Sequence, residues 1–260
     1  MSNAKSVRVL LLLVVLLIVA LGAWRDRAQT TSWKHPLYLV VYPINGDGSD
    51  ASARTIATLT PERFAPVEAF FSAEASRYGV KLEYDQPPVR VRVAPEVHEL
   101  PPAPPPNGNI LAVMAWSLRL RWWAWQHGDY KTGPGQIRMF VLYYDPDRHP
   151  RLAHSLGLEK GLIGVVNAFA GTEMEGENQV VIAHEFLHTV GASDKYDPAT
   201  TLPLFPEGYA DPGRQPRYPQ AAAELMGGRI PLSPADAEIP EGLHQTMVGT
   251  VTAAEIGWLK

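Results

Sequence analysis

The pattern of hydrophobic and polar positions predicts a domain that mixes strands with a few helices. Short runs rich in β-branched and aromatic residues, some with strict alternation, are typical of strands. Longer runs with apolar residues three and four positions apart are typical of helices. We expect strands at residues 37–43, 80–84, 89–93, 136–144 and 161–170. We expect helices at residues 61–78, 109–127, 178–190 and 252–259.

The helix expected at residues 109–127 is apolar on two faces. One face carries Leu111, Met114, Ala115, Leu118, Trp122 and Trp125, and the other carries Trp116, Leu120 and Trp123. Large aromatic side chains dominate protein cores, so we interpret this helix as buried on both sides. Contact with a membrane interface, where tryptophan is also enriched, is the alternative.

An unbroken apolar run occupies residues 9–24, with basic residues on both sides. A run of this length near the N-terminus fits a signal-peptide core or a short membrane segment. We interpret it as an uncleaved signal anchor, which predicts a single-pass transmembrane helix and a domain on the periplasmic or extracellular side. Secretion after signal cleavage is the alternative. The expected organisation is a signal anchor or signal peptide at residues 1–24, a tether at 25–36 and one domain at 37–260.

Composition narrows the classes of function. The 260 residues carry a net charge of −4 and no basic run, which argues against a nucleic-acid partner. The chain has no cysteine, so disulfides and cysteine-based zinc sites are excluded. Composition leaves the oligomeric state open.

One segment, HEFLHTVGASD at residues 184–194, carries the candidate chemistry. Residues four apart lie on one face of a helix, so His184 and His188 would point at one metal ion. Glu185 would lie beside that metal, with its carboxylate able to reach a bound water. Gly191 permits a sharp turn that would bring Asp194 back as a third ligand. The pattern therefore predicts a zinc site with a built-in general base.

The third ligand has alternatives. Glu224 and Glu207 lie downstream, where some zinc enzymes place a glutamate ligand. In that case Asp194 would bind Ca²⁺ together with Asp197, cap a turn, or form a hydrogen bond with a ligand histidine.

A hydrogen-bond donor is also expected near the metal, because negative charge develops on the carbonyl oxygen during hydrolysis. The candidate donors are Tyr196, Tyr209, Tyr218 and His244. The remaining histidines, at positions 35, 98, 127, 149 and 154, are interpreted as surface or structural residues.

The motif and its surroundings resemble the metzincin clan of zinc endopeptidases. The signature of that clan is HExxHxxGxxH, with aspartate in the last position in snapalysin-type members. The continuation DKYD at residues 194–197 is also similar to the immune inhibitor A group of secreted bacterial metallopeptidases. The resemblance implies a methionine turn beneath the metal, and Met226 in the sequence LMGG stands where that turn is expected. It is specific over residues 178–228 and extends over 37–170 only in the order of elements.

The resemblance implies an α+β, zincin-like domain with a mixed twisted sheet, an active-site helix carrying HExxH, a methionine turn and a C-terminal helix. It implies a membrane-anchored or exported zinc endopeptidase that hydrolyses protein or peptide bonds with zinc-activated water and Glu185 as general base. One alternative is a non-catalytic, zinc-stabilised binding or assembly module on the same scaffold. Glu185 argues against that module, because a structural site has no use for a base. A hydrolase acting on a non-peptide amide is a further alternative.

Overall fold

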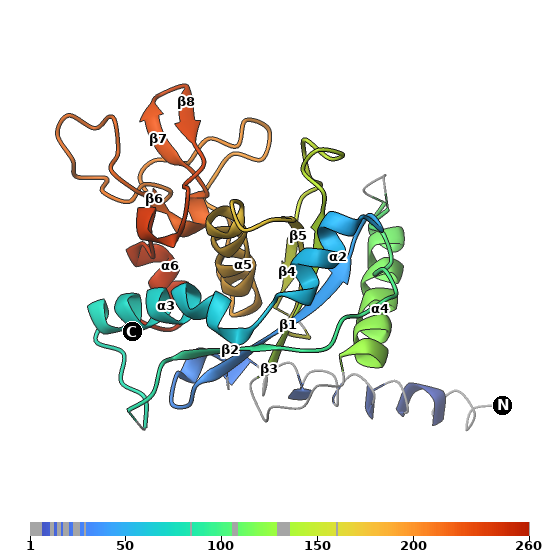
Figure 1. Cartoon of the computed structure of the whole chain (residues 1–260). Helices are drawn as coiled ribbons and strands as arrows, with labels where there is room; N and C mark the ends of the chain where they lie inside the picture. The colour runs from blue at the N-terminus through green and yellow to red at the C-terminus, as the bar shows by residue number, and fades with distance from the viewer. Residues whose placement is uncertain are drawn as a thin grey trace.

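The structure is a computed structural model that describes residues 7–10, 13–14, 17, 21–22, 27–28, 30–83, 85–105, 109–128, 136–159 and 161–259. A five-stranded sheet runs through the middle of these residues (Figure 1). Its strands are β1 (Leu37–Asn45), β2 (Val89–Val93), β3 (Gln136–Tyr144), β4 (Leu156–Leu158) and β5 (Ile163–Phe169). Their order is β2-β1-β3-β5-β4, and all pairs are parallel except β4 with β5.

Helices cover both faces of the sheet. One face packs against α2 (Asp50–Ala57), α3 (Ala65–Arg77), α5 (Glu175–Thr189) and α6 (Thr250–Glu255), and the other packs against α4 (Ile110–His127). Figure 1 shows α4 standing apart from α3 and α5. Successive side chains of a strand point to opposite faces, so in β1 Val41 joins the α3/α5 core and Val40 joins the α4 core. Burial on both faces explains why β1 is apolar without alternation.

The chain beyond α5 forms short elements. Two pairs of strands occur here: β6 (Ala223–Glu224) with β9 (Thr246–Met247), and β7 (Ile230–Ser233) with β8 (Asp236–Glu238). The 3₁₀ helices of the described chain are η1 (Pro61–Phe64), η2 (Leu225–Gly227) and η3 (Leu243–Gln245). The pieces that follow α5 lie beside this helix rather than extending the main sheet (Figure 1).

Most of the predicted elements are present. The strands expected at 37–43, 89–93, 136–144 and 161–170 are β1, β2, β3 and β5. The helix expected at 61–78 is η1 with α3, and the helix expected at 109–127 is α4. The helix expected at 252–259 is only partly present, because α6 spans Thr250–Glu255. The strand expected at 80–84 is wrong over its described residues 80–83. There the N–H of Val80 donates to the carbonyl of Ala75 and so closes the end of α3. Short elements such as α2, β4 and the β7–β8 hairpin were not expected.

The helix that carries the HEFLH motif begins earlier than predicted. The helix was expected to begin at residue 178, but α5 starts at Glu175 with Met174 as the capping residue. The Asn178 side chain accepts from the N–H of Phe169 (3.0 Å) and donates to the carbonyl of Phe169 (2.8 Å). This side chain therefore ties the first turn of α5 to the end of β5.

Within the described part of the chain, the prediction that α4 is buried on both sides is wrong. Leu120, Trp123 and Ala124 are buried against the sheet. The other predicted apolar face, which includes Trp122 and Trp125, is exposed within the described part of the chain. The sheet can cover only one side of a helix that lies across it.

The prediction of a membrane-spanning signal anchor is also contradicted. Among the described residues, no helix is both long enough and apolar enough to cross a membrane. Much of the run at residues 9–24 lies outside the described residues. A helix of that length would reach only about 24 Å, less than the roughly 30 Å of a bilayer core. A single-pass membrane location therefore does not stand, and secretion after cleavage stays a prediction.

At the coarse level the predicted fold class is confirmed, because the chain is a mixed α/β structure with a mostly parallel sheet. The domain boundaries stay a prediction. Trp33 precedes the expected domain start, yet its side chain is buried and its ring packs edge-on against Trp258 at 5.3 Å between centroids.

Candidate metal centre

Helix α5 has one side that is buried in the core and another side that carries the motif histidines. Its apolar residues lie in the main core, and Phe186 packs on Phe71 with ring centroids 4.8 Å apart. His184 and His188 lie one turn apart on the other side, with ring centroids 4.8 Å apart. Because a close-packed core fixes the rotation of the helix, packing sets the direction of both imidazoles.

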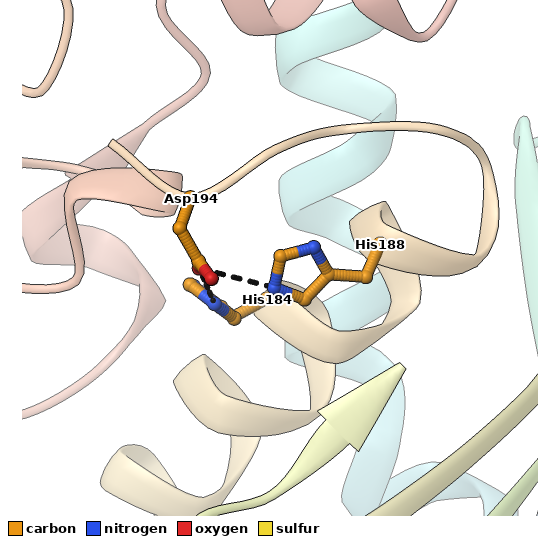
Figure 2. A group of neighbouring side chains, drawn as sticks. All are labelled: His184, His188 and Asp194. Carbon is orange, nitrogen blue, oxygen red and sulfur yellow. Dashed lines mark hydrogen bonds and ion pairs between the residues drawn. The ribbon is translucent and has the colours of Figure 1, made fainter. Parts of the chain in front are cut away.

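The two histidines and Asp194 meet as the sequence predicts. The Oδ1 atom of Asp194 lies 3.1 Å from Nε2 of His184 and 3.1 Å from Nε2 of His188. The three candidate ligand atoms all lie within 4.8 Å of one another. Figure 2 shows Asp194 reaching back from the loop after α5 toward both rings.

The turn that returns Asp194 to the helix depends on Gly191. Its φ is +107°, a conformation in which an L side chain would be strained. The N–H of Gly191 donates to the carbonyl of His188 (3.2 Å), and the N–H of Ala192 donates to that of Leu187 (3.0 Å). These bonds satisfy the last carbonyls of α5 and reverse the chain direction within three residues of the helix end.

A carboxylate from α6 holds the loop on both sides of Asp194. Glu255 accepts hydrogen bonds from the Ser193 backbone N–H (3.1 Å) and from its hydroxyl (2.6 Å). It also forms a 2.7 Å ion pair with Lys195, whose side chain is 2 % exposed. Sequence reasoning missed Glu255 and Lys195, because no local spacing links two residues on elements so far apart in the chain.

The hydrogen bond at Nδ1 of each imidazole determines whether Nε2 of the same ring can bind a metal ion. Nδ1 of His184 lies 2.9 Å from the carbonyl of Leu225, and Nδ1 of His188 lies 2.9 Å from that of Ala192. A carbonyl oxygen only accepts, so each Nδ1 carries a proton, and a ring that carries only this proton presents a lone pair at Nε2.

Three lone-pair atoms, two Nε2 and one carboxylate oxygen, therefore converge on one point. Such a group is stable when a cation lies between its members, and two histidines with one carboxylate are the donor set of many catalytic zinc sites. The residues present thus fit a metal ion of this type.

The directions of the pKa shifts of Asp194 and His188 agree with a positive charge between the two imidazoles and the carboxylate. Burial would raise the pKa of Asp194, but its hydrogen bonds with His184 and His188 hold that pKa well below its ordinary value. Burial would lower the pKa of His188, but Asp194 and Glu185 raise it overall.

Glu185 lies at the wall of a cavity beside the two histidines. Its side chain is 5 % exposed, and its Oε2 atom has no hydrogen-bond partner in the described part of the chain. Burial raises the pKa of this carboxyl, against the opposing effect of His184 and His188. The cavity measures about 570 Å³, which is within the usual range for a binding pocket. Its apolar lining includes Leu152, Phe169, Val180, Val181 and Ile239.

The turn that carries Met226 contacts His184 through its backbone. Met226 is fully buried in the turn η2, and the preceding residue, Leu225, supplies the carbonyl that orients His184. Glu224 anchors this turn rather than facing the cluster. Its carboxylate accepts from the N–H of Gly227 (2.8 Å), the N–H of Gly249 (2.9 Å) and the Thr252 hydroxyl (2.7 Å).

The other candidate carboxylates are not part of the cluster. Glu207 is exposed and lies outside the group of three. Asp197 caps a turn, because its Oδ1 accepts from the N–H groups of Ala199 (2.7 Å) and Thr200 (3.1 Å). Of the carboxylates weighed from the sequence as third ligand, only Asp194 has the geometry for it in the described chain.

Tyr196 is the tyrosine that the structure brings to the site. It lines the same cavity as Glu185, and its ring centroid lies 6.2 Å from that of His184. Burial, together with the negative charges of Asp194 and Glu185, raises the pKa of Tyr196 to about 12. Tyr209 and Tyr218 instead pair with each other through their hydroxyls at 2.7 Å.

His154, one of the histidines interpreted as surface or structural, is exposed. It also lines the cavity together with Glu185. It lies just before the edge strand β4, and no motif marks it. His244, a candidate donor, is exposed and is not among the residues that line this cavity.

Comparison with known proteins does not assign a family. No protein-family model matches the chain, and no curated protein matches it. Among solved structures, wild-type OgpA from Akkermansia muciniphila is similar in two crystal forms, with 15 % identity and TM-scores of 0.39 and 0.40. OgpA in complex with an O-glycopeptide substrate is similar at 13 % identity and a TM-score of 0.39. Each match covers 86 % of this chain and 60 % of the OgpA chain.

We predict that Glu224→Ala destabilises the protein by about 3–5 kcal/mol, because three donors, two of them in buried hydrogen bonds, lose their acceptor at once. Glu207→Ala, at an exposed position, is the matched control and should change stability by less than about 0.5 kcal/mol. Urea unfolding followed by tryptophan fluorescence measures both. Equal, small losses in the two variants would show that Glu224 does not anchor the turn.

Proposed function

We propose that this protein is a zinc-dependent endopeptidase, with His184, His188 and Asp194 as zinc ligands. The observation that carries the proposal is the buried Oε2 of Glu185, which has no hydrogen-bond partner among the described residues and lies on a cavity beside the three converging ligand atoms. A buried carboxylate oxygen is rarely left without a partner unless it has a chemical role. A structural zinc site would be closed and would not need such a group.

Glu185 is suited to move a proton between water and the leaving amine. Bound zinc would act as a Lewis acid that polarises the peptide carbonyl and makes water more acidic. Glu185 accepts one proton from the attacking water as the new C–O bond forms. It then donates that proton to the amide nitrogen as the C–N bond breaks, and the second proton of the water stays on the new carboxyl group, so the products are a carboxylic acid and an amine. The burial that raises the pKa of Glu185 strengthens it as the proton acceptor.

Tyr196 is suited to donate a hydrogen bond to the carbonyl oxygen while negative charge develops on it. Its side chain lines the cavity next to His184 and Glu185. With a pKa of about 12, its hydroxyl keeps its proton throughout the neutral range and remains a donor. A donor already in place stabilises the charge without rearrangement during the reaction.

The edge of the sheet beside the site supports a peptide as the substrate. Strand β4 is the edge strand and packs so closely on α5 that a Cβ at Gly157 would collide with the backbone of Glu185 and with His188. An extended peptide can add to such an edge through backbone hydrogen bonds. Its scissile carbonyl would then pass over the motif, and an adjacent side chain would enter the largely apolar cavity.

We predict that the full-length protein binds about one Zn²⁺ per chain and that Asp194→Ala weakens this affinity at least about 100-fold, since even outer-sphere partners contribute 10- to 100-fold. Asp197→Ala and Glu207→Ala are the matched controls and should bind Zn²⁺ like the wild type. Competition with a chelating dye measures all four proteins. An unchanged affinity in Asp194→Ala, or a loss in Glu207→Ala, would contradict the assigned ligand.

We predict that Glu185→Gln keeps its zinc and lowers peptide hydrolysis at least about 100-fold, because the general base is lost. Glu177→Gln changes another glutamate on the same cavity and should remain active. Mass spectrometry of a digested mixture of unstructured peptides measures cleavage, and a chelator should abolish it reversibly. Zinc binding without any cleavage by the wild type would favour the non-catalytic binding or assembly module.

We predict that Tyr196→Phe lowers kcat about 100-fold with little change in KM or in zinc content, because the hydroxyl acts on charge that exists only in the transition state. Tyr218→Phe removes a hydroxyl that pairs with Tyr209 and should leave kcat nearly unchanged. Steady-state kinetics on a peptide cleaved by the wild type compares the two. A rise in KM alone would mean that Tyr196 binds substrate without stabilising the oxyanion.

A further inference from the structure

Helix α4 carries a row of large apolar side chains that the described part of the chain leaves uncovered. This row, the α4 stripe, consists of Leu111, Met114, Leu118, Trp122 and Trp125, each more than half exposed. On the other side of the helix, side chains of the same character are buried against the sheet. A helix that is apolar all round is normally buried all round. The stripe is therefore expected to meet a second apolar surface.

The α4 stripe is large enough to be a stable protein interface. Trp122 and Trp125 are 61 % and 65 % exposed, and their rings pack together with centroids 5.0 Å apart. Since an aromatic side chain offers about 150–250 Å², the whole stripe presents on the order of 600–700 Å². The largest apolar patch on a typical monomer is about 300–600 Å². Each partner in a standard protein interface contributes about 800 Å².

The spacing of the stripe is symmetric about Leu118. Met114 and Trp122 lie four residues before and after it, and Leu111 and Trp125 lie seven residues before and after it. Around a two-fold axis at Leu118, two antiparallel copies of α4 place each residue opposite the one at the same distance on the other side. Leu118 then meets itself, which makes the stripe complementary to its own copy.

The sizes of the side chains favour this antiparallel arrangement. The smaller Leu111 and Met114 lie in the first half of the stripe, and the two tryptophans lie in the second half. Antiparallel packing sets each tryptophan against a smaller, flexible side chain, which fills space evenly. It also places the sulfur of Met114 against the partner subunit's Trp122, a favourable contact. Parallel packing would instead set tryptophan against tryptophan and leave gaps between the leucines.

The polar residues of α4 lie beside the stripe rather than within it. The Arg121 guanidinium donates to the Ser117 hydroxyl at 2.8 Å along the helix. Arg119 is exposed next to Leu118, at the position where interfaces have their polar rim. Tryptophan with arginine would also suit an anionic lipid surface, so the experiment must separate the two.

We propose that the α4 stripe is the interface of a two-fold symmetric homodimer, in which α4 packs antiparallel on α4 of a second copy with Leu118 at the axis. This interface is on the opposite face of the sheet from α5 and does not depend on the function proposed for the metal centre.

Cysteine cross-linking tests the register, because the natural chain has no cysteine. In helices packed about 8–10 Å apart, facing Cα atoms come within disulfide reach. Leu118→Cys in the full-length protein should therefore form a covalent dimer under mild oxidation. Met114→Cys is the matched control and should not, because equivalent positions would lie about 12 Å apart along the helices. Met114→Cys combined with Trp122→Cys should restore cross-linking, since these two positions face each other.

The mass of the full-length protein in solution tests the interface without cross-links. Light scattering should give the wild type twice the mass of Leu118→Lys, in which two charges would meet at the axis. Ala112→Lys adds the same charge at an exposed position of α4 outside the stripe and should remain dimeric. Far-ultraviolet circular dichroism of both variants serves as a check that the fold is intact.

Several outcomes would overturn the proposal. A wild type that is monomeric and sediments with phosphatidylglycerol vesicles, while Leu118→Lys does not, would assign the stripe to a lipid surface. Efficient cross-linking of Met114→Cys alone would exclude the antiparallel register. An oligomer that persists in Leu118→Lys would mean that another segment, such as residues 9–24, holds the copies together.

Discussion

The candidate site depends on the packing of one helix. Helix α5 must bury Ala183, Phe186 and their apolar neighbours beneath the sheet, and this leaves a single rotation for His184 and His188. Truncating large side chains in a close-packed core costs about 2–5 kcal/mol each, so turning the helix away from this position would be strongly unfavourable. The imidazoles are therefore aimed by apolar packing, and a metal ion would meet ligands that are already in place.

The C-terminal part of the chain completes what the helix begins. The Leu225 carbonyl orients one imidazole, and Glu224 holds the turn that carries this carbonyl. Glu255 holds the loop that carries Asp194. Glu224 and Glu255 are not metal ligands in our assignment, but they fix the geometry of the residues that we propose as ligands. This division of roles explains why the cluster is compact although its members come from a helix and an irregular loop.

The elements predicted correctly are those whose pattern depends on near neighbours. The buried runs of β1 and β3 and the long apolar helix α4 are set by residues within a few positions of one another. The edge strand β4 and the helix α2 were missed because a few residues carry too little periodicity to distinguish a strand or a short helix from a loop. The burial of α4 was also misjudged, since periodicity shows that a face is apolar without showing what covers it.

Local sequence patterns also could not show which distant residues contact the candidate site. The sequence alone determined that His184, Glu185 and His188 share one turn of helix and that Gly191 can turn the chain, because helix spacing and glycine conformation are local properties. Only the tertiary structure decided among the carboxylates. It gave Glu224 its three donors and brought Asp194 to the histidines. Those contacts join segments that are distant along the chain, and their geometry is fixed only when the core closes around them.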